Sequence, residues 1–374
     1  MSNQIFQSLK KLPTPFSQTQ CVLHKHEILI CGGYKQRNCY SYHTIKNEYK
    51  FICEYPRDVY LERHCVVKLM DNSSNKNDQI TLLSFGGRSK HTLVMKYVSI
   101  WNNDNEINKS KRSKKSKKFN QWKPFTDNNN HPIILGRDGD YYEGVRAVIG
   151  GSNNHLLFIA YLFSNISVFD LNKFQFIKHD QLPTHSSQCN CFISRSENRQ
   201  EMKTNEEKDN SKKKKKIEML SFYTFTGFSI EYNEDNNTFR FCQLTFCNDV
   251  ELFCRYAYVR INDIILLFGG YDRGSVNSIV HSYSISENTW IKLEYTLPIP
   301  SCDCFGILNE DKTYIHIIGG NNNKMIPLST HMKTKVNALR NSSQLVIFIS
   351  IFFFVIKHKS ILLYKTDEQT INRQ

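Results

Sequence analysis

The sequence predicts an all-β fold built from repeated units, and three recurring features support this prediction. The first is an apolar run that ends in a glycine pair. The second is a pair of aromatic residues seven positions apart across a polar turn. The third is a leucine or tyrosine followed by proline at the end of a unit. A self-similar pattern with a period of about 50 residues is typical of a repeat architecture.

The glycine pairs mark the second strand of each unit. They recur about 50 residues apart, with one gap that is long enough for two further units. Glycine lets a strand turn sharply and lets a neighbouring backbone come close. The pairs are Gly32 and Gly33, Gly86 and Gly87, Gly269 and Gly270, and Gly319 and Gly320.

The aromatic pairs mark the third and fourth strands. Turn-forming residues separate the two members of each pair, which predicts a hairpin with the aromatics on neighbouring antiparallel strands. Proline after Tyr55, Leu182 and Leu297 fits the exit from an outer strand, where no ladder donor is needed. The aromatic pairs are Tyr42 with Tyr49, Phe169 with Phe176, Tyr232 with Phe239, and Tyr283 with Trp290.

Together these residues resemble the kelch motif, in which a glycine pair is followed by a tyrosine and then by a tryptophan. The resemblance covers roughly residues 1–336. It implies that each unit is one four-stranded blade of a β-propeller. It also implies that the aromatics fill the wedge between blades, so we expect Tyr283 and Trp290 to be buried packing residues.

Counting the strands predicts a six-bladed propeller, with five or seven blades as alternatives. We label the strands of a blade a to d, from the channel outward. In blade three, Gly150 and Gly151 are out of register and fit the a–b turn, which leaves Ala160 and Tyr161 at the expected glycine position. Blade four keeps only Gly227.

The N-terminus is predicted to close the ring. Blade six lacks an obvious fourth strand, and residues 5–9, followed by Leu12 and Pro13, look like a fourth strand with no partners of its own. Closure would remove the exposed sheet edges that invite aggregation. We therefore expect a propeller at residues 1–338 and a separate tail at residues 339–374.

The net charge of +14 is concentrated in two insertions. Residues 109–118 carry seven basic side chains and residues 212–216 carry five, so the rest of the chain has a charge of +2. The insertions, at about 102–121 and 196–216, are expected on one face, in a c–d and an a–b connection. Three interpretations stay open: solvated loops without function, a weak handle for anionic lipid or nucleic acid, or a nuclear-import address.

The twelve cysteines are expected to be reduced thiols, because the N-terminus does not resemble a signal peptide. Cys189, Cys191, Cys302 and Cys304 fit small apolar fillers at the start of inner strands. The alternative of a zinc site lacks the usual ligand spacing. We expect no metal site, no cofactor site and no catalytic residue, since none of the common motifs is present.

The tail contains an apolar run at residues 345–356, interrupted by one serine. A helix needs about 20 residues to cross a bilayer, so this run is too short. It could be a packed strand or helix, an interfacial or short tail anchor, or a sequence foreign to the domain. The protein is expected in the cytoplasm, with a membrane-associated or a nuclear location as alternatives.

The kelch resemblance implies a non-enzymatic scaffold that binds a protein partner of unknown identity and acts as a monomer. No BTB or F-box domain is evident. The alternatives are a membrane-associated kelch protein and a carbohydrate-acting enzyme, because the kelch-like superfamily includes galactose oxidase and sialic-acid mutarotase. A copper-radical site cannot be assigned to particular residues. Charged residues converging on the channel mouth would favour an enzyme, and a flat or apolar mouth would argue against one.

A specific partner is expected on the face that carries the b–c loops. The candidate contacts follow strand b at equivalent positions, so a ring would gather them around one rim. Arginine and tyrosine are also enriched among interface hot spots. The alternative is a set of ordinary exposed loop residues. The candidates are Tyr34, Lys35, Arg37, Arg88, His91, Tyr271, Asp272 and Arg273.

Overall fold

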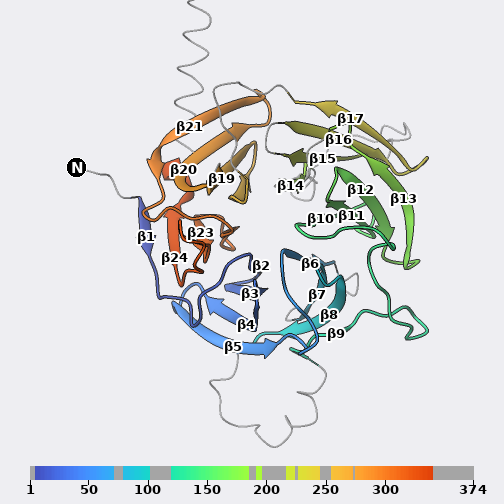
Figure 1. Cartoon of the computed structure of the whole chain (residues 1–374), viewed down its shortest axis with the longest axis horizontal. Coiled ribbons are helices and arrows are strands. Elements are labelled where there is room, and N and C mark those ends of the chain that lie inside the picture. The colour runs from blue at the N-terminus through green and yellow to red at the C-terminus, as the bar shows by residue number, and fades with distance from the viewer. Residues whose placement is uncertain are drawn as a thin grey trace, which may run out of the picture.

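The structure is a ring of six four-stranded sheets around a central channel (Figure 1). The computed structural model describes residues 5–70, 79–101, 119–184, 191–195, 216–223, 226–244, 254–272 and 274–339. Every sheet in this part of the chain is antiparallel, with its first strand innermost. The prediction of an all-β, six-bladed propeller is therefore confirmed.

Each blade follows the chain order from the channel outward, except that the last blade takes its outer strand from the N-terminus. Blade one contains β2 (Gln20–His24), β3 (Glu27–Gly33), β4 (Gln36–His43) and β5 (Glu48–Glu54), and blade two contains β6 (His64–Leu69), β7 (Gln79–Gly86), β8 (His91–Val98) and β9 (Lys123–Pro124). Blade three contains β10 (Arg146–Gly150), β11 (Leu156–Tyr161), β12 (Asn165–Asp170) and β13 (Gln175–Gln181), and blade four contains β14 (Cys191–Ser194), β15 (Lys216–Phe222), β16 (Gly227–Asn233) and β17 (Thr238–Gln243). Blade five contains β18 (Ala257–Ile261), β19 (Ile264–Asp272), β20 (Ser275–Ser284) and β21 (Thr289–Thr296), and blade six contains β22 (Phe305–Leu308), β23 (Tyr314–Ile318), β24 (His331–Lys335) and β1 (Phe6–Ser8).

The predicted closure by the N-terminus is confirmed. β1 pairs with β24 in the register Phe6 to Thr334 and Ser8 to Met332, and Figure 1 shows the two strands side by side. The Leu9 amide extends the pairing by donating to the His331 carbonyl at 2.8 Å. The Phe6 side chain is buried and packs edge-on against Phe268 of blade five. This short strand therefore links blade six both to the N-terminus and to its neighbour.

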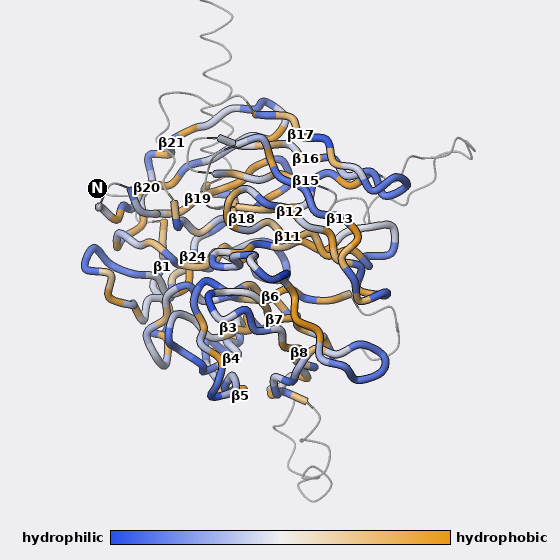
Figure 2. The backbone as a smooth tube through the Cα atoms, turned by 45° about the vertical axis from the view of Figure 1, so that its right-hand side comes forward, coloured by the Kyte–Doolittle hydropathy of each residue, from blue (hydrophilic) through white to orange (hydrophobic). Residues whose placement is uncertain are grey.

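In blades four and five, the aromatic pair packs against the preceding blade. Tyr283 and Trp290 are both buried, and their rings lie 5.0 and 5.3 Å from the ring of Phe222 in blade four. In the same way, the ring of Tyr232 lies 5.1 Å from Phe158 of blade three. Figure 2 shows that hydrophobic strand segments alternate with hydrophilic turns along the chain. The predicted packing role of these aromatics is confirmed.

A tyrosine–asparagine hydrogen bond fixes the c–d turn in three blades. The asparagine lies five residues after the tyrosine and has a positive φ, a conformation that asparagine tolerates better than most residues. Blade three has phenylalanine at both positions, so the hydroxyl and its partner are missing together. The bonds join Tyr42 to Asn47 at 2.9 Å, Tyr232 to Asn237 at 2.7 Å, and Tyr283 to Asn288 at 2.7 Å.

The recurring glycines after strand b have a steric cause. Gly269 and Gly319 both have φ near +64°. A Cβ on Gly269 would collide with the Ser301 carbonyl oxygen, and one on Gly319 would lie 2.5 Å from the Phe16 carbonyl oxygen. Both carbonyls belong to crossovers between blades. The glycines therefore let a crossover pass directly over the end of strand b.

Blades three and four both lack the glycine pair at the end of strand b, but in different ways. In blade three, Gly150 ends β10 and Gly151 lies in the a–b turn with φ of +89°, as predicted. In blade four, Gly227 does not end strand b, because β15 stops at Phe222 and Gly227 begins β16. A Cβ on Gly227 would lie 2.8 Å from the Phe222 ring, so this glycine serves packing within the hairpin instead.

Both lysine-rich insertions join strand ends on the same face. One connects Val98 of β8 to Lys123 of β9, and the other connects Ser194 of β14 to Lys216 of β15. Most of both insertions, and the tail with residues 345–356, lie outside the described residues. Within the described residues, no helix has the length and apolarity needed to cross a membrane.

Deleting residues 1–12 should lower the melting temperature by more than 10 °C. The deletion exposes the edge of β24 and removes the buried side chains of Phe6 and Leu12. Burial of two such side chains is worth several kcal/mol. Calorimetry of the full chain and of the deletion variant measures the effect, and matching melting curves would contradict closure by β1.

Trp290→Ala should destabilise the propeller by about 3–5 kcal/mol, because truncation of a buried tryptophan leaves a cavity. Urea denaturation measures the loss. Phe51→Ala is the matched control, since Phe51 is 53% exposed on the outer strand β5 and should cost less than about 0.5 kcal/mol. Equal losses for the two variants would show that Trp290 is not a packing residue.

Stability should fall as the pH drops from about 6.5 towards 4. Burial lowers the pKa of His64, His281 and His316 to about 4, and that of His91 to about 3. The folded chain keeps these rings neutral while the unfolded chain protonates them, so their contribution is complete above pH 6.5 and is lost below it. Each ring should contribute up to about 1.4 kcal/mol per pH unit in that window.

Urea midpoints at pH 7, 5.5 and 4.5 measure this dependence. A His316→Gln variant should show a shallower fall over the same range, because one titrating group is gone. An unchanged slope in the variant would contradict a contribution of His316 to the acid sensitivity.

Candidate functional site

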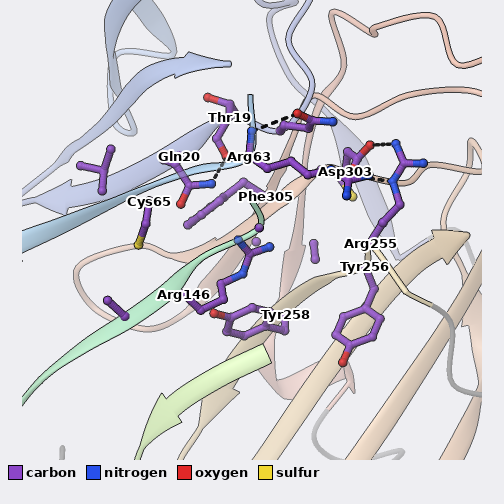
Figure 3. A pocket seen from close by; sticks show the side chains of 17 residues that line it. Thr19, Gln20, Arg63, Cys65, Arg146, Arg255, Tyr256, Tyr258, Asp303 and Phe305 are labelled. Carbon is purple, nitrogen blue, oxygen red and sulfur yellow. Dashed lines mark hydrogen bonds and ion pairs between the residues drawn. The ribbon is translucent and has the colours of Figure 1, made fainter. Parts of the chain in front are cut away.

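A cavity of about 200 Å³ opens at one end of the central channel. It lies where the inner strands begin, on the face that carries the b–c loops and the d–a crossovers. Its wall comes from five of the six blades (Figure 3). The residues that line it are Gln18, Thr19, Gln20, Arg63, Cys65, Val66, Gly144, Arg146, Ala147, Arg255, Tyr256, Ala257, Tyr258, Asp303, Cys304, Phe305 and Gly306.

Before five of the inner strands, the residue one or two positions ahead of the strand has a left-handed backbone. Such a conformation is uncommon for residues other than glycine and costs about 1 kcal/mol or more. Non-glycine residues held in this region often mark functional sites. The φ angles are +55° for Gln18, +53° for Arg63, +75° for Gly144, +61° for Arg255 and +55° for Asp303.

These left-handed residues are joined by hydrogen bonds around the mouth. The Asp303 amide donates to the Arg255 carbonyl at 2.7 Å, and the Gln18 amide donates to the Asp303 carbonyl at 2.9 Å. The Gly144 amide donates to the Arg63 carbonyl at 3.0 Å. Between them, the Gln18 side-chain oxygen accepts from the Arg63 amide at 3.2 Å. The chain of bonds links five blades and fixes the backbone that carries the charged side chains.

Three arginines enter the cavity from different sides (Figure 3). Arg255 forms a two-point ion pair with Asp303, in which its Nε donates to Oδ1 at 2.9 Å and its Nη2 donates to Oδ2. Asn321 also donates to Asp303 at 3.0 Å. Burial disfavours the charge on Arg255, but the hydrogen bonds and negative charge of Asp303 outweigh burial and raise its pKa.

The cavity has an excess of positive charge. Arg63 pairs with Glu143 at 3.4 Å, and Arg146 begins β10 and donates to the Val145 carbonyl at 3.2 Å. Among the described lining residues, three are arginines and only Asp303 is a carboxylate. The positive charge of Arg63 also acts to lower the pKa of the Cys254 and Cys302 thiols, which lie just before β18 and β22. The arrangement can therefore hold an anionic group.

Burial keeps the cysteine thiols near the cavity protonated. Burial raises the pKa of Cys65 to about 11 and the pKa values of Cys302 and Cys304 to about 12. A protonated thiol is a poor nucleophile and a poor metal ligand. In the part of the chain that is described, no group of three histidine, cysteine, aspartate or glutamate side chains is arranged to hold a metal ion.

The rim candidates divide into exposed residues and supporting ones. Arg88 has a side chain that is 73% exposed and pairs with Glu62 at 3.7 Å. The Lys35 ammonium lies 5.1 Å from the ring centre of Tyr34, and Tyr34 contacts Tyr60 edge-on at 6.5 Å. These residues lie at the surface of the b–c face.

The remaining candidates have other surroundings. His91 is buried, with its Nε2 2.8 Å from the Ser84 hydroxyl, so the prediction of a rim contact is wrong for this residue. The Arg37 guanidinium donates to the Tyr55 carbonyl at 3.4 Å. The ring of Tyr271 lies 5.4 Å from the Arg255 guanidinium and supports it. Asp272 ends β19, and Arg273 lies outside the described residues.

An exposed aromatic pair on the same face was not predicted from the sequence. Tyr141 and Phe163 are 61% and 53% exposed, and their rings meet edge-on at 5.9 Å. Phe163 has φ of +62° and Ser164 has φ of +60°, so a bulky residue is held in a strained turn. The only sequence signal is an apolar residue at a tight b–c turn.

A hydrogen-bond network lies beside the loops that carry this aromatic pair. The Arg137 guanidinium forms two bonds with the Asp140 carboxylate, at 3.2 and 3.1 Å. The Tyr161 hydroxyl donates to Asp140 at 3.4 Å and lies 3.1 Å from the Ser167 hydroxyl. Asp140 and Tyr161 adjoin Tyr141 and the Phe163 turn, so the network fixes both loops before any partner binds.

Exposed apolar side chains gather on the b–c face. Seven of the ten large apolar side chains that are exposed among the described residues lie in its b–c loops or d–a crossovers. The other three are Phe51 on an outer strand and Ile45 and Met70 near the opposite face. The seven are Tyr60, Ile134, Tyr141, Phe163, Ile299, Met325 and Ile326.

Comparison with known proteins supports the fold assignment. The kelch motif family matches residues 252–294, which include most of blade five. The chain is therefore a six-bladed propeller whose fifth blade matches the kelch motif. The solved structure titled "Structure of YjhT" is similar to it, with a TM-score of 0.56 and 11% identity over 86% of this chain and 95% of that chain. No curated protein matches the sequence.

Many solved structures share the fold of this propeller. In all, 988 chains of solved structures match its fold. A fold shared so widely does not select one activity, because function depends on the site that a fold carries. Any function must therefore be argued from the mouth and the face around it.

Proposed function

We propose that this kelch propeller is a protein-interaction module that binds its partner on the b–c face. The observation that supports the proposal is the concentration of exposed apolar side chains on that face, around a charged cavity. Exposed aromatic and apolar patches with charged groups beside them are typical of protein interfaces. Kelch-repeat propellers in general serve as interaction modules.

The anchor of the interface is the pair Tyr141 and Phe163. Both side chains are exposed, and their rings contact one another on loops that adjoin the Arg137–Asp140–Tyr161 network, so we expect a small loss of conformational freedom on binding. Tyrosine and other large aromatics dominate hot spots, where truncation commonly costs about 2 kcal/mol or more. Arg88 and Tyr34 extend the same surface towards blades one and two.

Affinity capture tests this proposal, with the full chain as bait in an extract of the cells that express it. Wild-type chain and an Ile45→Ser variant should capture the same partner, because Ile45 is 70% exposed on the opposite face. Tyr141→Ser and Phe163→Ser should each lose at least about 90% of that capture, since about 2 kcal/mol is a roughly thirtyfold change in affinity. Thermal melts check that all variants are folded.

Two outcomes would contradict the proposal. Capture that survives both aromatic substitutions would place the partner elsewhere. Capture that disappears when residues 109–118 are deleted, and that occurs only at low salt, would mean binding through the lysine-rich insertions, because exposed charge pairs are screened by salt. Either result would remove the b–c face as the interface.

The charged mouth also favours a second candidate, an enzyme acting on an acidic carbohydrate. Three arginines could hold a sugar carboxylate, but the only lining carboxylate among the described residues, Asp303, is committed to Arg255 and Asn321. General acid–base chemistry needs a group that is free to exchange a proton. Proton NMR of glucuronate and N-acetylneuraminate with and without the protein tests this candidate, and any catalysed change would support it.

A further inference from the structure

We propose that the end of the central channel opposite the mouth binds a medium-chain fatty acid. The carboxylate of the acid would pair with Lys68, and its hydrocarbon chain would lie against the inner strands. This inference is independent of the proposed partner interface, which is on the other face. A second cavity, the composition of its wall and one ammonium without an acidic partner carry the argument.

The second cavity has a volume of about 520 Å³. Its wall comes from the inner strands β2, β6, β10 and β14, which are neighbours around the channel (Figure 1). Asn154 in the a–b turn of blade three and Ser194 at the end of β14 place it at the end opposite the mouth. Val66 and Ala147 line both cavities, so the two adjoin along the channel. The volume is within the range of about 300–1,000 Å³ that is usual for small-molecule sites.

Most of the wall of this second cavity is apolar. A hydrocarbon chain that covers apolar surface gains affinity with its length, by up to about fourfold for each methylene that leaves water. The thiol of Cys21 is no exception, because burial raises its pKa and keeps it uncharged. The larger apolar side chains in the wall are Val22, Leu23, Val67, Met70, Val148 and Ile149.

Lys68 is the one charged side chain among the described residues that line this cavity. It lies near the end of β6, and its side chain is accessible. No carboxylate in the described part of the chain forms an ion pair with it, whereas Lys173, Lys178 and Lys216 each pair with an acidic side chain. Partial burial disfavours the ammonium and lowers its pKa. An incoming carboxylate would supply the missing negative charge through charge-assisted hydrogen bonds.

A single ammonium beside an apolar wall favours a ligand with one negative charge and a hydrocarbon body. Nucleic acids need several cations along their backbone, and the described wall offers one. A sugar needs many hydrogen-bonding groups, whereas Asn154 and Ser194 are the main polar neighbours of Lys68 in the described wall. An uncharged lipid would leave the ammonium of Lys68 without a partner. A fatty acid matches both the charge and the wall.

Isothermal titration calorimetry of the full chain with octanoate tests this inference. Octanoate should bind at one site, at least about tenfold more tightly than butyrate, because butyrate has four fewer methylenes to bury. It should also bind at least about tenfold more tightly than octanol, which has the same chain without the charge. Octanol therefore separates a free acid from an acyl chain whose carboxylate is absent.

Lys68→Met keeps the length of the side chain and removes its charge. It should weaken octanoate binding at least about tenfold and leave octanol binding within about threefold. Lys292→Met is the matched control, because Lys292 is exposed on the outer strand β21 and its loss changes the net charge equally. This control should leave octanoate binding within about twofold. Thermal melts of each variant separate lost binding from lost folding.

Two further variants locate the ligand. Ala147→Leu narrows the cavity and should weaken octanoate and octanol alike, whereas Phe163→Ser on the b–c face should change neither. Equal affinities for octanoate and octanol, or equal octanoate binding by the wild-type chain and Lys68→Met, would overturn the proposal. Loss of binding in Phe163→Ser, with full binding in Ala147→Leu, would place the acid on the exposed apolar side chains of the b–c face and would also overturn it.

Discussion

The pairing of β1 with β24 joins the start of the chain to its last blade, and every other feature depends on that closure. A propeller blade has no stable place alone, because its faces must be covered by neighbouring blades on both sides. Closure removes the free edge of β24 and places Phe6 against Phe268 in blade five. Only a closed ring brings the starts of the inner strands together at one mouth.

Closure has a second consequence at that mouth. Five inner strands are preceded by residues with left-handed backbones, and hydrogen bonds link these residues from one blade to the next. Four of the five are not glycine, so their left-handed backbone is strained. In return, each places a side chain at the channel entrance. The result is a set of arginines, an aspartate and a glutamine held by the ring itself. A rigid scaffold that presents polar groups at its centre suits recognition.

Most of the fold could be predicted from the sequence, whereas the cavity at the channel mouth could not. Local patterns such as Leu12 with Pro13, and Tyr283 with Trp290, report hairpins and packing, and they predicted the closing strand and the blade wedges. Arg63, Arg146 and Arg255 come from three blades and share no local motif, so their convergence depends on the ring. A usable signal was present, since Arg63 and Arg255 each stand just before an inner strand. Burial of His91 also depends on Tyr55 and His64, which no local pattern reveals.

The location of the interface is the central claim, and site-specific photo-crosslinking tests it most directly. Benzoylphenylalanine in place of Phe163 would report any protein bound against the b–c face, and the same group in place of Ile45 would report the opposite face. We expect a discrete crosslinked adduct from position 163 and none from position 45. An adduct from position 45 alone would contradict it.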